Sequence, residues 1–120
     1  MNKADFVESL KNRTKQLAVE VILLYDNIKK TDATRVIGRQ LIRSVTSTAA
    51  NYRAACLARS QREFFAKMSI VVEEADETLF WLEMLRDANF VAEEALKPLM
   101  VETVEIVKIV SKARKNASNK

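Results

Sequence analysis

The sequence contains almost no residues that make tight turns, since Gly38 is its single glycine and Pro98 its single proline. Glycine supplies the positive φ angles that hairpins and tight loops require. A β-sandwich or an α/β domain of 120 residues needs many such turns, whereas a bundle of long helices needs few. The chain is therefore expected to be all-α, and its length suits a single domain over residues 1–120.

Composition and hydropathy point to a globular protein away from membranes. Hydrophobic residues make up 48% of the chain and charged residues 30%, a balance unlike that of disordered segments. Residues 1–9 lack the apolar stretch of a secretory signal, and the longest apolar run, residues 19–25, is broken by Glu20 and is far too short to span a bilayer. We expect a cytoplasmic protein with no membrane partner, in which the single cysteine, Cys56, is a reduced core residue.

Apolar residues recur every three or four positions in four segments, which predicts four amphipathic helices. Ser60 and Glu63 form a capping-box pattern before the third helix, Thr31 or Asp32 caps the second, and Asn89 ends the third. Short connections between helices of this length predict an antiparallel up-down-up-down four-helix bundle. The expected helices cover about residues 5–29, 33–58, 61–88 and 92–115, followed by a frayed basic tail at 116–120.

The same periodicity predicts which side chains face the core. Gly38 lies inside the second helix, where it costs about 1 kcal/mol relative to alanine. Pro98 lies near the start of the fourth helix and either delays that start or bends the helix. The expected core faces include Phe6, Leu10, Leu17, Val21 and Leu24, then Ile37, Leu41, Val45, Thr48, Tyr52 and Ala55, then Phe64, Met68, Val71, Ala75, Leu82 and Leu85, and finally Leu96, Met100, Thr103, Val107 and Val110.

Enzyme functions are disfavoured by the residues that the chain lacks. With no histidine, the commonest general base is missing, and so are the Glu-x-x-His ligands of di-iron bundles. One cysteine is too few for a structural zinc site within the chain, and one glycine is too few for a P-loop or a dinucleotide fingerprint. A carboxylate-based site needs a pocket that sequence does not reveal. We expect no enzyme, no catalytic residue, no cofactor and no metal.

Charge is unevenly distributed along a chain whose net charge is +4. Residues 33–60 carry five arginines and no acid, whereas residues 61–90 carry seven acids and three bases. The arginines either bind phosphates, with the nearby aromatic residues stacking on bases, or neutralise the acidic third helix. The aromatic residues are Tyr52, Phe64 and Phe65, and the candidate nucleic-acid-binding residues are Arg35, Arg39, Arg53, Arg59, Arg62 and Lys67.

Arg43 and Glu77 lie equally far along the chain from Ser60, on either side of it. If the turn between the second and third helices is centred on Ser60, antiparallel packing places both residues at the same height. We therefore expect an ion pair that is partly buried, with Ser47 and Asn51 satisfying its remaining polar groups. Such a pair would fix the register of two helices. A solvated surface pair is the alternative.

The stretch between about residues 36 and 85 carries a family resemblance. Its patterns are Gln40-Leu-Ile-Arg-Ser-Val-Thr-Ser47, Ala50-Asn-Tyr-Arg53, Ala58-Arg-Ser60, Glu63-Phe64, Lys67-Met-Ser-Ile70, Glu73-Glu-Ala-Asp-Glu-Thr78 and Trp81-Leu-Glu-Met-Leu85. They resemble the bacterial four-helix bundle proteins of the 23S ribosomal RNA intervening-sequence family.

The resemblance implies a left-handed four-helix bundle that assembles as a ring-shaped homopentamer. The family is also similar to the accessory proteins of diversity-generating retroelements, which bind a reverse transcriptase and nucleic acid. Carried over to this chain, that likeness again gives five arginines as candidates, which are Arg35, Arg39, Arg53, Arg59 and Arg62. No catalytic residue is implied.

Two functions stay open at this stage. The first is a non-catalytic oligomeric helical scaffold that binds RNA or DNA, and it predicts salt-sensitive binding of polyanions. The alternative is a protein-only adaptor that partners an enzyme such as a reverse transcriptase, with binding that survives moderate salt. The third helix has two apolar stripes, which favours self-association, and Tyr52 and Trp81 are candidate interface anchors.

Overall fold

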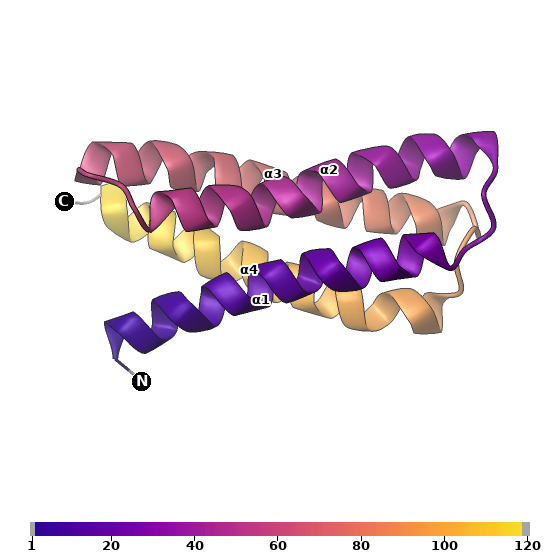
Figure 1. Cartoon of the computed structure of the whole chain (residues 1–120), viewed down its shortest axis with the longest axis horizontal. Helices are drawn as coiled ribbons and strands as arrows, with labels where there is room; N and C mark the ends of the chain where they lie inside the picture. The colour runs from indigo at the N-terminus through magenta and orange to yellow at the C-terminus, as the bar shows by residue number, and fades with distance from the viewer. Residues whose placement is uncertain (1, 119–120) are drawn as a thin grey trace.

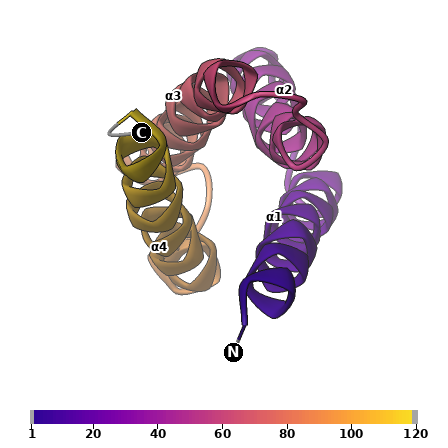
Figure 2. The ribbon, with the colours of Figure 1, turned by 90° about the vertical axis from the view of Figure 1, so that its left-hand side faces the viewer.

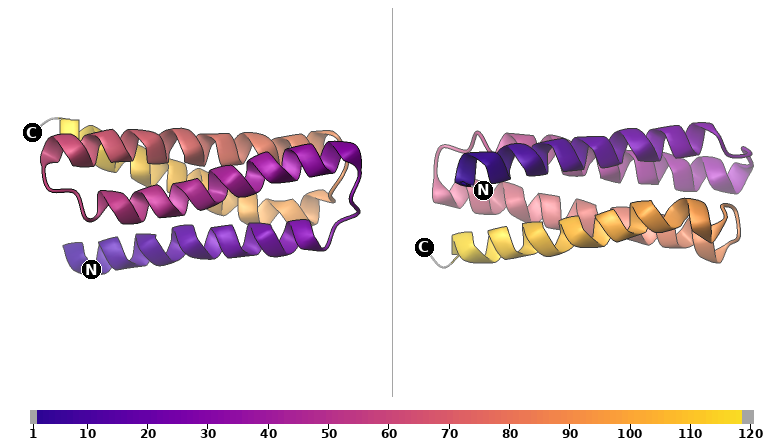
Figure 3. Two further views of the ribbon diagram at one scale, coloured as in Figure 1. Left: turned by 45° about the horizontal axis from the view of Figure 1, so that its top comes forward. Right: turned by 90° about the horizontal axis from the view of Figure 1, so that it is seen from below.

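Four α-helices make up the fold in the computed structural model, which describes residues 2–118. Successive helices run in opposite directions, so both termini lie at the same end (Figure 1). Seen from below, α1 and α4 form the near layer and α2 and α3 the far one (Figure 3, right). The predicted all-α bundle is confirmed, with helices α1 Lys3–Asp26, α2 Asp32–Ala55, α3 Gln61–Asp87 and α4 Glu93–Ser118.

Caps shift α1 towards the N-terminus from the predicted range of 5–29. Asn2 Oδ1 accepts a hydrogen bond from the backbone N–H of Asp5 at 2.8 Å, which starts the helix early. At the other end, the backbone N–H of Asn27 bonds to the carbonyl oxygen of Leu24 at 3.1 Å and closes the last turn.

Hydroxyl caps begin α2 and α3. Thr31 and Thr34 form a reciprocal capping box, in which each side-chain oxygen accepts the other's backbone N–H, at 3.1 and 2.7 Å. Ser60 Oγ accepts the backbone N–H of Glu63 at 3.0 Å, as predicted. The Glu63 carboxylate does not return to Ser60 but accepts the N–H of Arg59 at 3.4 Å, so that capping box is displaced by one residue.

Two further boundaries differ from prediction. α2 ends at Ala55 rather than near residue 58, because Leu57 and Ala58 bond to carbonyls three residues back and tighten the chain into a turn. The prediction that the tail frays from residue 116 is wrong for residues 116–118, which continue α4. Ala117 is only 7% exposed, so packing holds this last turn. Residues 119–120 lie outside the described range.

The core runs the length of the bundle and follows most of the predicted stripes. All six predicted positions on α2 are buried, while Phe6 is 41% exposed and Thr14 takes a core position on α1. Core hydroxyls find partners in their own helices, for example Thr14 Oγ1 on the carbonyl of Leu10 at 3.0 Å. Ser44 Oγ and Thr78 Oγ1 also lie 3.0 Å apart and link α2 to α3.

The helices are not packed equally tightly. α2 and α3 share the most extensive contact, whereas α1 and α4 meet least. The end view shows the result as a horseshoe, with the start of α1 standing apart from the end of α4 (Figure 2). One bidentate ion pair crosses this seam: Arg13 Nε and Nη2 donate to the two Glu102 carboxylate oxygens at 2.9 and 2.6 Å.

Candidate nucleic-acid interface

Arginines line the solvent side of α2. Arg35, Arg39, Arg43 and Arg53 are all exposed, and no acid follows Asp32 within this helix. Arg35 and Arg53 are about 27 Å apart along the helix axis. The sequence pattern therefore does produce a basic stripe, carried by one rigid helix.

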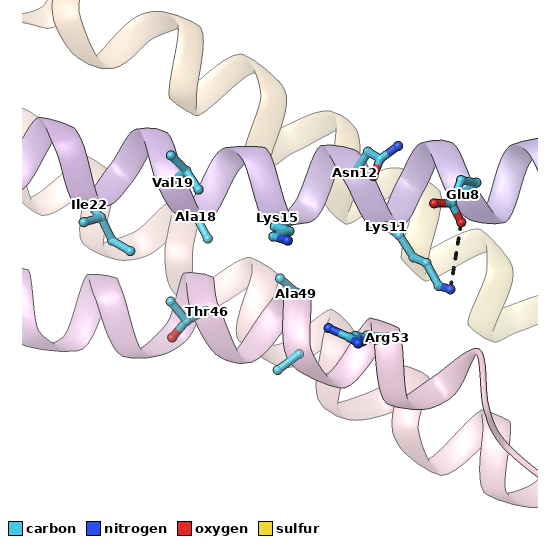
Figure 4. Close-up of a pocket in the computed structure, with 11 residues that line it drawn as sticks. Glu8, Lys11, Asn12, Lys15, Ala18, Val19, Ile22, Thr46, Ala49 and Arg53 are labelled. Carbon is cyan, nitrogen blue, oxygen red and sulfur yellow. Dashed lines mark ion pairs between the residues drawn. The ribbon is translucent and has the colours of Figure 1, made fainter.

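A groove of about 480 Å³ lies beside this stripe, between α1 and α2. Lys11 and Lys15 project into it from α1 and Arg53 from α2, while Ala18 and Ala49 are among the small residues of its floor (Figure 4). Glu8 is its one acidic lining residue and lies 4.0 Å from Lys11. Because the cations outnumber the acid, the groove attracts anions.

The predicted nucleic-acid-binding residues do not form one patch. Arg35 and Arg39 lie near the start of α2, whereas the other four candidates lie towards the opposite end of the bundle (Figure 1). Arg35 is 3.6 Å from Asp32 and Arg59 is 3.7 Å from Glu63, so both have acidic partners. Among the described residues, no acid lies within ion-pair distance of four of the candidates, which are Arg39, Arg53, Arg62 and Lys67.

Lys11 and Lys15 were not among the predicted site residues. Their four-residue spacing places them on one side of α1, off its apolar face, which is a detectable signal. What sequence did not supply is the rotation of α1 that turns this side towards Arg53. The three cations together define the cationic groove: Lys11, Lys15 and Arg53.

The aromatic residues near these arginines are poorly placed to stack on bases. Tyr52 is only 3% exposed and lies in the core, and Phe64 packs against that core. The Phe65 ring is covered by the guanidinium of Arg114, 4.9 Å from the ring centroid. The exposed cations of α2 are therefore better placed for contact with phosphates than these rings are for stacking on bases.

Arg43 joins α2 to α3 at the height expected from its distance to Ser60. Its Nη2 donates to Glu77 Oε2, and its Nη1 donates to Glu74 Oε2 at 2.9 Å. The side chain of Arg43 is 46% exposed, whereas those of Glu77 and Glu74 are 34% and 17% exposed, so the guanidinium faces solvent and the carboxylates are largely covered. Trp81 Nε1 donates to Glu77 at 3.0 Å.

Ser47 and Asn51 were expected to complete this cluster, and that expectation is wrong. Asn51 Nδ2 donates instead to the backbone carbonyl and the hydroxyl of Ser47, at 2.9 and 3.0 Å. The indole N–H of Trp81, followed by the Arg43 guanidinium, lowers the pKa of Glu77. Because two carboxylates bind Arg43, the positive charge of the basic stripe on α2 is neutralised at this position.

The outer side of α3 carries exposed apolar residues between acids. Ile70, Phe80 and Met84 are 38%, 49% and 36% exposed, and the Phe80 and Trp81 rings meet edge to face with centroids 4.9 Å apart. Glu73 and Asp76 are exposed on the same helix. The α3 apolar patch, defined as Ile70, Phe80 and Met84, is therefore a candidate for contact with protein.

Neither a metal centre nor a membrane span is found in the part of the chain that the structure describes. Residues 2–118 contain no group of three metal-ligating side chains. None of their helices has an apolar stretch long enough to cross a bilayer.

Comparison with known proteins gives a family. The model of the 23S rRNA-intervening sequence protein family matches residues 9–112. A solved structure from Bacteroides thetaiotaomicron, described as a protein of unknown function from the S23 ribosomal protein family, is 30% identical with a TM-score of 0.81. The similarity covers 91% of this chain and 97% of that one. No curated protein matches. The chain therefore belongs to the 23S rRNA-intervening sequence protein family.

Proposed function

We propose that this protein is a non-catalytic, oligomeric helical scaffold that binds RNA or DNA through the phosphate backbone. The observation that supports nucleic-acid binding is the cationic groove, and Arg39 adds an exposed positive charge nearer the start of α2. Lys15 and Arg53 have no acid within ion-pair distance among residues 2–118. Their charges are therefore available to displace counterions from a polyanion.

Self-association is the second part of the proposal. The α3 apolar patch exposes large side chains that one bundle leaves uncovered. It lies on a different helix from the cationic groove, so a protomer can use α3 for its neighbours and α1 with α2 for nucleic acid. The family resemblance implies a ring of five protomers, and the α3 apolar patch is a surface suited to such contacts.

The deciding experiment compares RNA binding by the parent chain and a double variant, Lys15→Glu with Arg53→Glu, across a salt series. The parent is expected to bind a structured RNA with an affinity that falls as salt rises. The variant is expected to bind at least about tenfold more weakly, with a salt slope lower by roughly 2 units, because two phosphate contacts are lost.

A matched control changes the net charge equally on another surface. Lys97 and Lys108 are exposed on α4, away from the groove, so Lys97→Glu with Lys108→Glu is expected to retain nearly parental affinity. An equal loss in both variants would mean that net charge alone drives binding. A parent protein that binds no RNA or DNA would contradict the proposal and leave a protein-only adaptor, acting through the α3 apolar patch.

A further inference from the structure

A second hollow lies at the end of the bundle where α1 begins and α4 ends, separate from the cationic groove. Its volume is about 470 Å³, within the usual range of small-molecule pockets. It is bounded by the starts of α1 and α3 and by the ends of α2 and α4. This is the end at which α1 stands apart from α4 (Figure 2).

Small side chains leave this space open. Ala55 of α2 and both Ala113 and Ala117 of α4 line it, whereas core positions nearer the middle carry large residues such as Leu41 and Ile106. Bulkier residues at these alanines would fill the hollow. The end of the bundle therefore contains a cavity built by its sequence.

Tyr52 adds a buried polar group to a lining of mixed polarity, in which Ser60, Gln61 and Asn116 lie beside the alanines. The side chain is only 3% exposed, and its hydroxyl makes no hydrogen bond to nitrogen or oxygen among the described residues. Its polar neighbour is the thiol of Cys56, a weak hydrogen-bonding partner. Burial raises the pKa of Tyr52, which keeps the hydroxyl protonated as a donor.

The remaining lining sets the charge and polarity of a suitable ligand. Val7 and Phe64 add apolar wall, Lys3 and Arg59 provide positive charge at the edge, and no acid lines the cavity among the described residues. The ion pair of Arg59 with Glu63 is long, at 3.7 Å, and Arg59 is 91% exposed, so this pair competes weakly with a ligand.

We propose that this end cavity binds a small organic monoanion with an apolar body, such as a medium-chain carboxylate. The apolar body lies against Val7, Phe64 and the alanines. The carboxylate lies at the cationic edge, where Lys3 and Arg59 balance its charge. This site is independent of the proposed nucleic-acid binding.

Cys56 supplies a reporter for the test, because this residue is partly exposed and lines the cavity. The probe is octanoate, with binding followed by calorimetry and by the rate at which iodoacetamide alkylates Cys56. We expect octanoate to bind and to slow alkylation at least about fivefold at saturation, with both effects saturating together. Octylammonium, of the same length and opposite charge, is expected to do neither.

Two variants locate the binding site. Ala113→Leu fills the cavity and is expected to abolish octanoate binding while the protein melts at or above the parental temperature. If that variant fails to fold, Arg59→Ala serves instead, because Arg59 is a surface residue, and it is expected to weaken octanoate at least about threefold. Lys15→Glu, in the groove between α1 and α2, is the control and should bind octanoate as the parent does.

Several results would overturn the assignment. One is octanoate binding that leaves the alkylation of Cys56 unchanged. Another is binding lost in Lys15→Glu and retained in Ala113→Leu, which would move the ligand to the cationic groove. Equal binding of octanoate and octylammonium would refute an anion site.

Discussion

Asn89 is the non-glycine residue with a positive φ angle, 60°, in the described part of the chain. It follows α3 and completes a Schellman motif: its own N–H bonds to the carbonyl of Arg86, and the N–H of Phe90 bonds to that of Leu85, both at 3.0 Å. Only glycine adopts this left-handed conformation without a steric cost, and asparagine tolerates it better than other residues.

The stability of variants at residue 89 should therefore depend on how easily the new residue adopts a positive φ angle, and not on its helix propensity. Asn89→Gly is expected to raise the free energy of unfolding by up to about 1 kcal/mol, and Asn89→Ala to lower it by about 1 kcal/mol. Urea denaturation of the three proteins measures both differences. Equal stability of the alanine and glycine variants would refute a left-handed residue at this position.

The ion-pair cluster between α2 and α3 can be tested by the pH dependence of stability, because it contains the titratable group of Glu77. Its pKa is lowered below the ordinary 4.5, first by the Trp81 N–H and then by Arg43. A carboxyl group whose pKa is lower in the folded protein than in the unfolded one stabilises the fold at any pH above its unfolded-state pKa. That stabilisation is lost as the pH falls through the folded-state pKa. Glu77→Gln should therefore cost stability near neutral pH and flatten the decline below about pH 4.5.

Thermal melts between about pH 6 and about pH 3 measure that difference. Because the cluster is partly exposed, the loss near neutral pH should stay near or below about 1 kcal/mol. Glu73→Gln, an exposed acid on the same helix, is the matched control. A parallel pH profile for parent and Glu77→Gln would contradict the role assigned to the carboxylate.

At the scale of the helices, the glycine within α2 has a packing role. Gly38 is buried, and a Cβ atom added there would overlap the ring of Tyr25 from α1. The ring is itself held beneath Lys30, whose Nζ lies 4.7 Å from the centroid. The helix-propensity cost of glycine is thus offset by close approach of α1 to α2.

Gly38→Ala is expected to lower the free energy of unfolding by about 1–3 kcal/mol, because overpacking outweighs the gain of about 1 kcal/mol in helix propensity. The control is the same substitution with Tyr25→Ala, where alanine at residue 38 should become neutral or stabilising. Calorimetric melting of the four proteins in this cycle measures the coupling. Additive effects would refute the contact.

The Arg13 and Glu102 pair should hold the seam between α1 and α4, where few other contacts exist. Arg13→Ala is expected to cost about 1 kcal/mol overall and to increase hydrogen exchange more in α1 than in α2 or α3. Arg13→Lys, which keeps the charge without the bidentate geometry, should fall between parent and alanine. Uniform loss of protection across all helices would contradict a local role.

Sequence predicted what depends on local spacing and missed what depends on the rotation of one helix against another. The burial of Leu41 and Val45 follows from three- and four-residue steps within α2. The height of Arg43 relative to Glu77 follows from counting residues away from one turn. By contrast, periodicity does not reveal which helices face the open seam, so the partner of Arg13 was not found.

The candidate site shows the same division. The exposed arginines of α2 were identified because their spacing keeps them off the apolar stripe. Lys11 and Lys15 were not predicted, because they join the groove only through the rotation of α1 that turns them towards Arg53. The burial of Tyr52 follows from its place on the core-facing stripe, and it removes Tyr52 from the aromatic residues that could stack on bases.

For the whole molecule, the α3 apolar patch predicts a concentration-dependent assembly. Phe80→Glu should lower the mass measured by light scattering while circular dichroism and melting remain close to parental, because Phe80 is 49% exposed in the single chain. Val101→Glu, at a 56% exposed position on α4, is the control and should assemble normally. A parent protein that is monomeric throughout would contradict assembly through this patch.

The unequal contacts among the helices also have a consequence for synthesis on the ribosome. The chain emerges α1 first, but the most extensive contact joins α2 to α3, and α3 also packs closely on α4. Leu96, Ile106 and Val110 of α4 are fully buried in the finished bundle, so the faces that they cover stay exposed until α4 has been made. Nascent chains that lack α4 are therefore expected to be prone to aggregation.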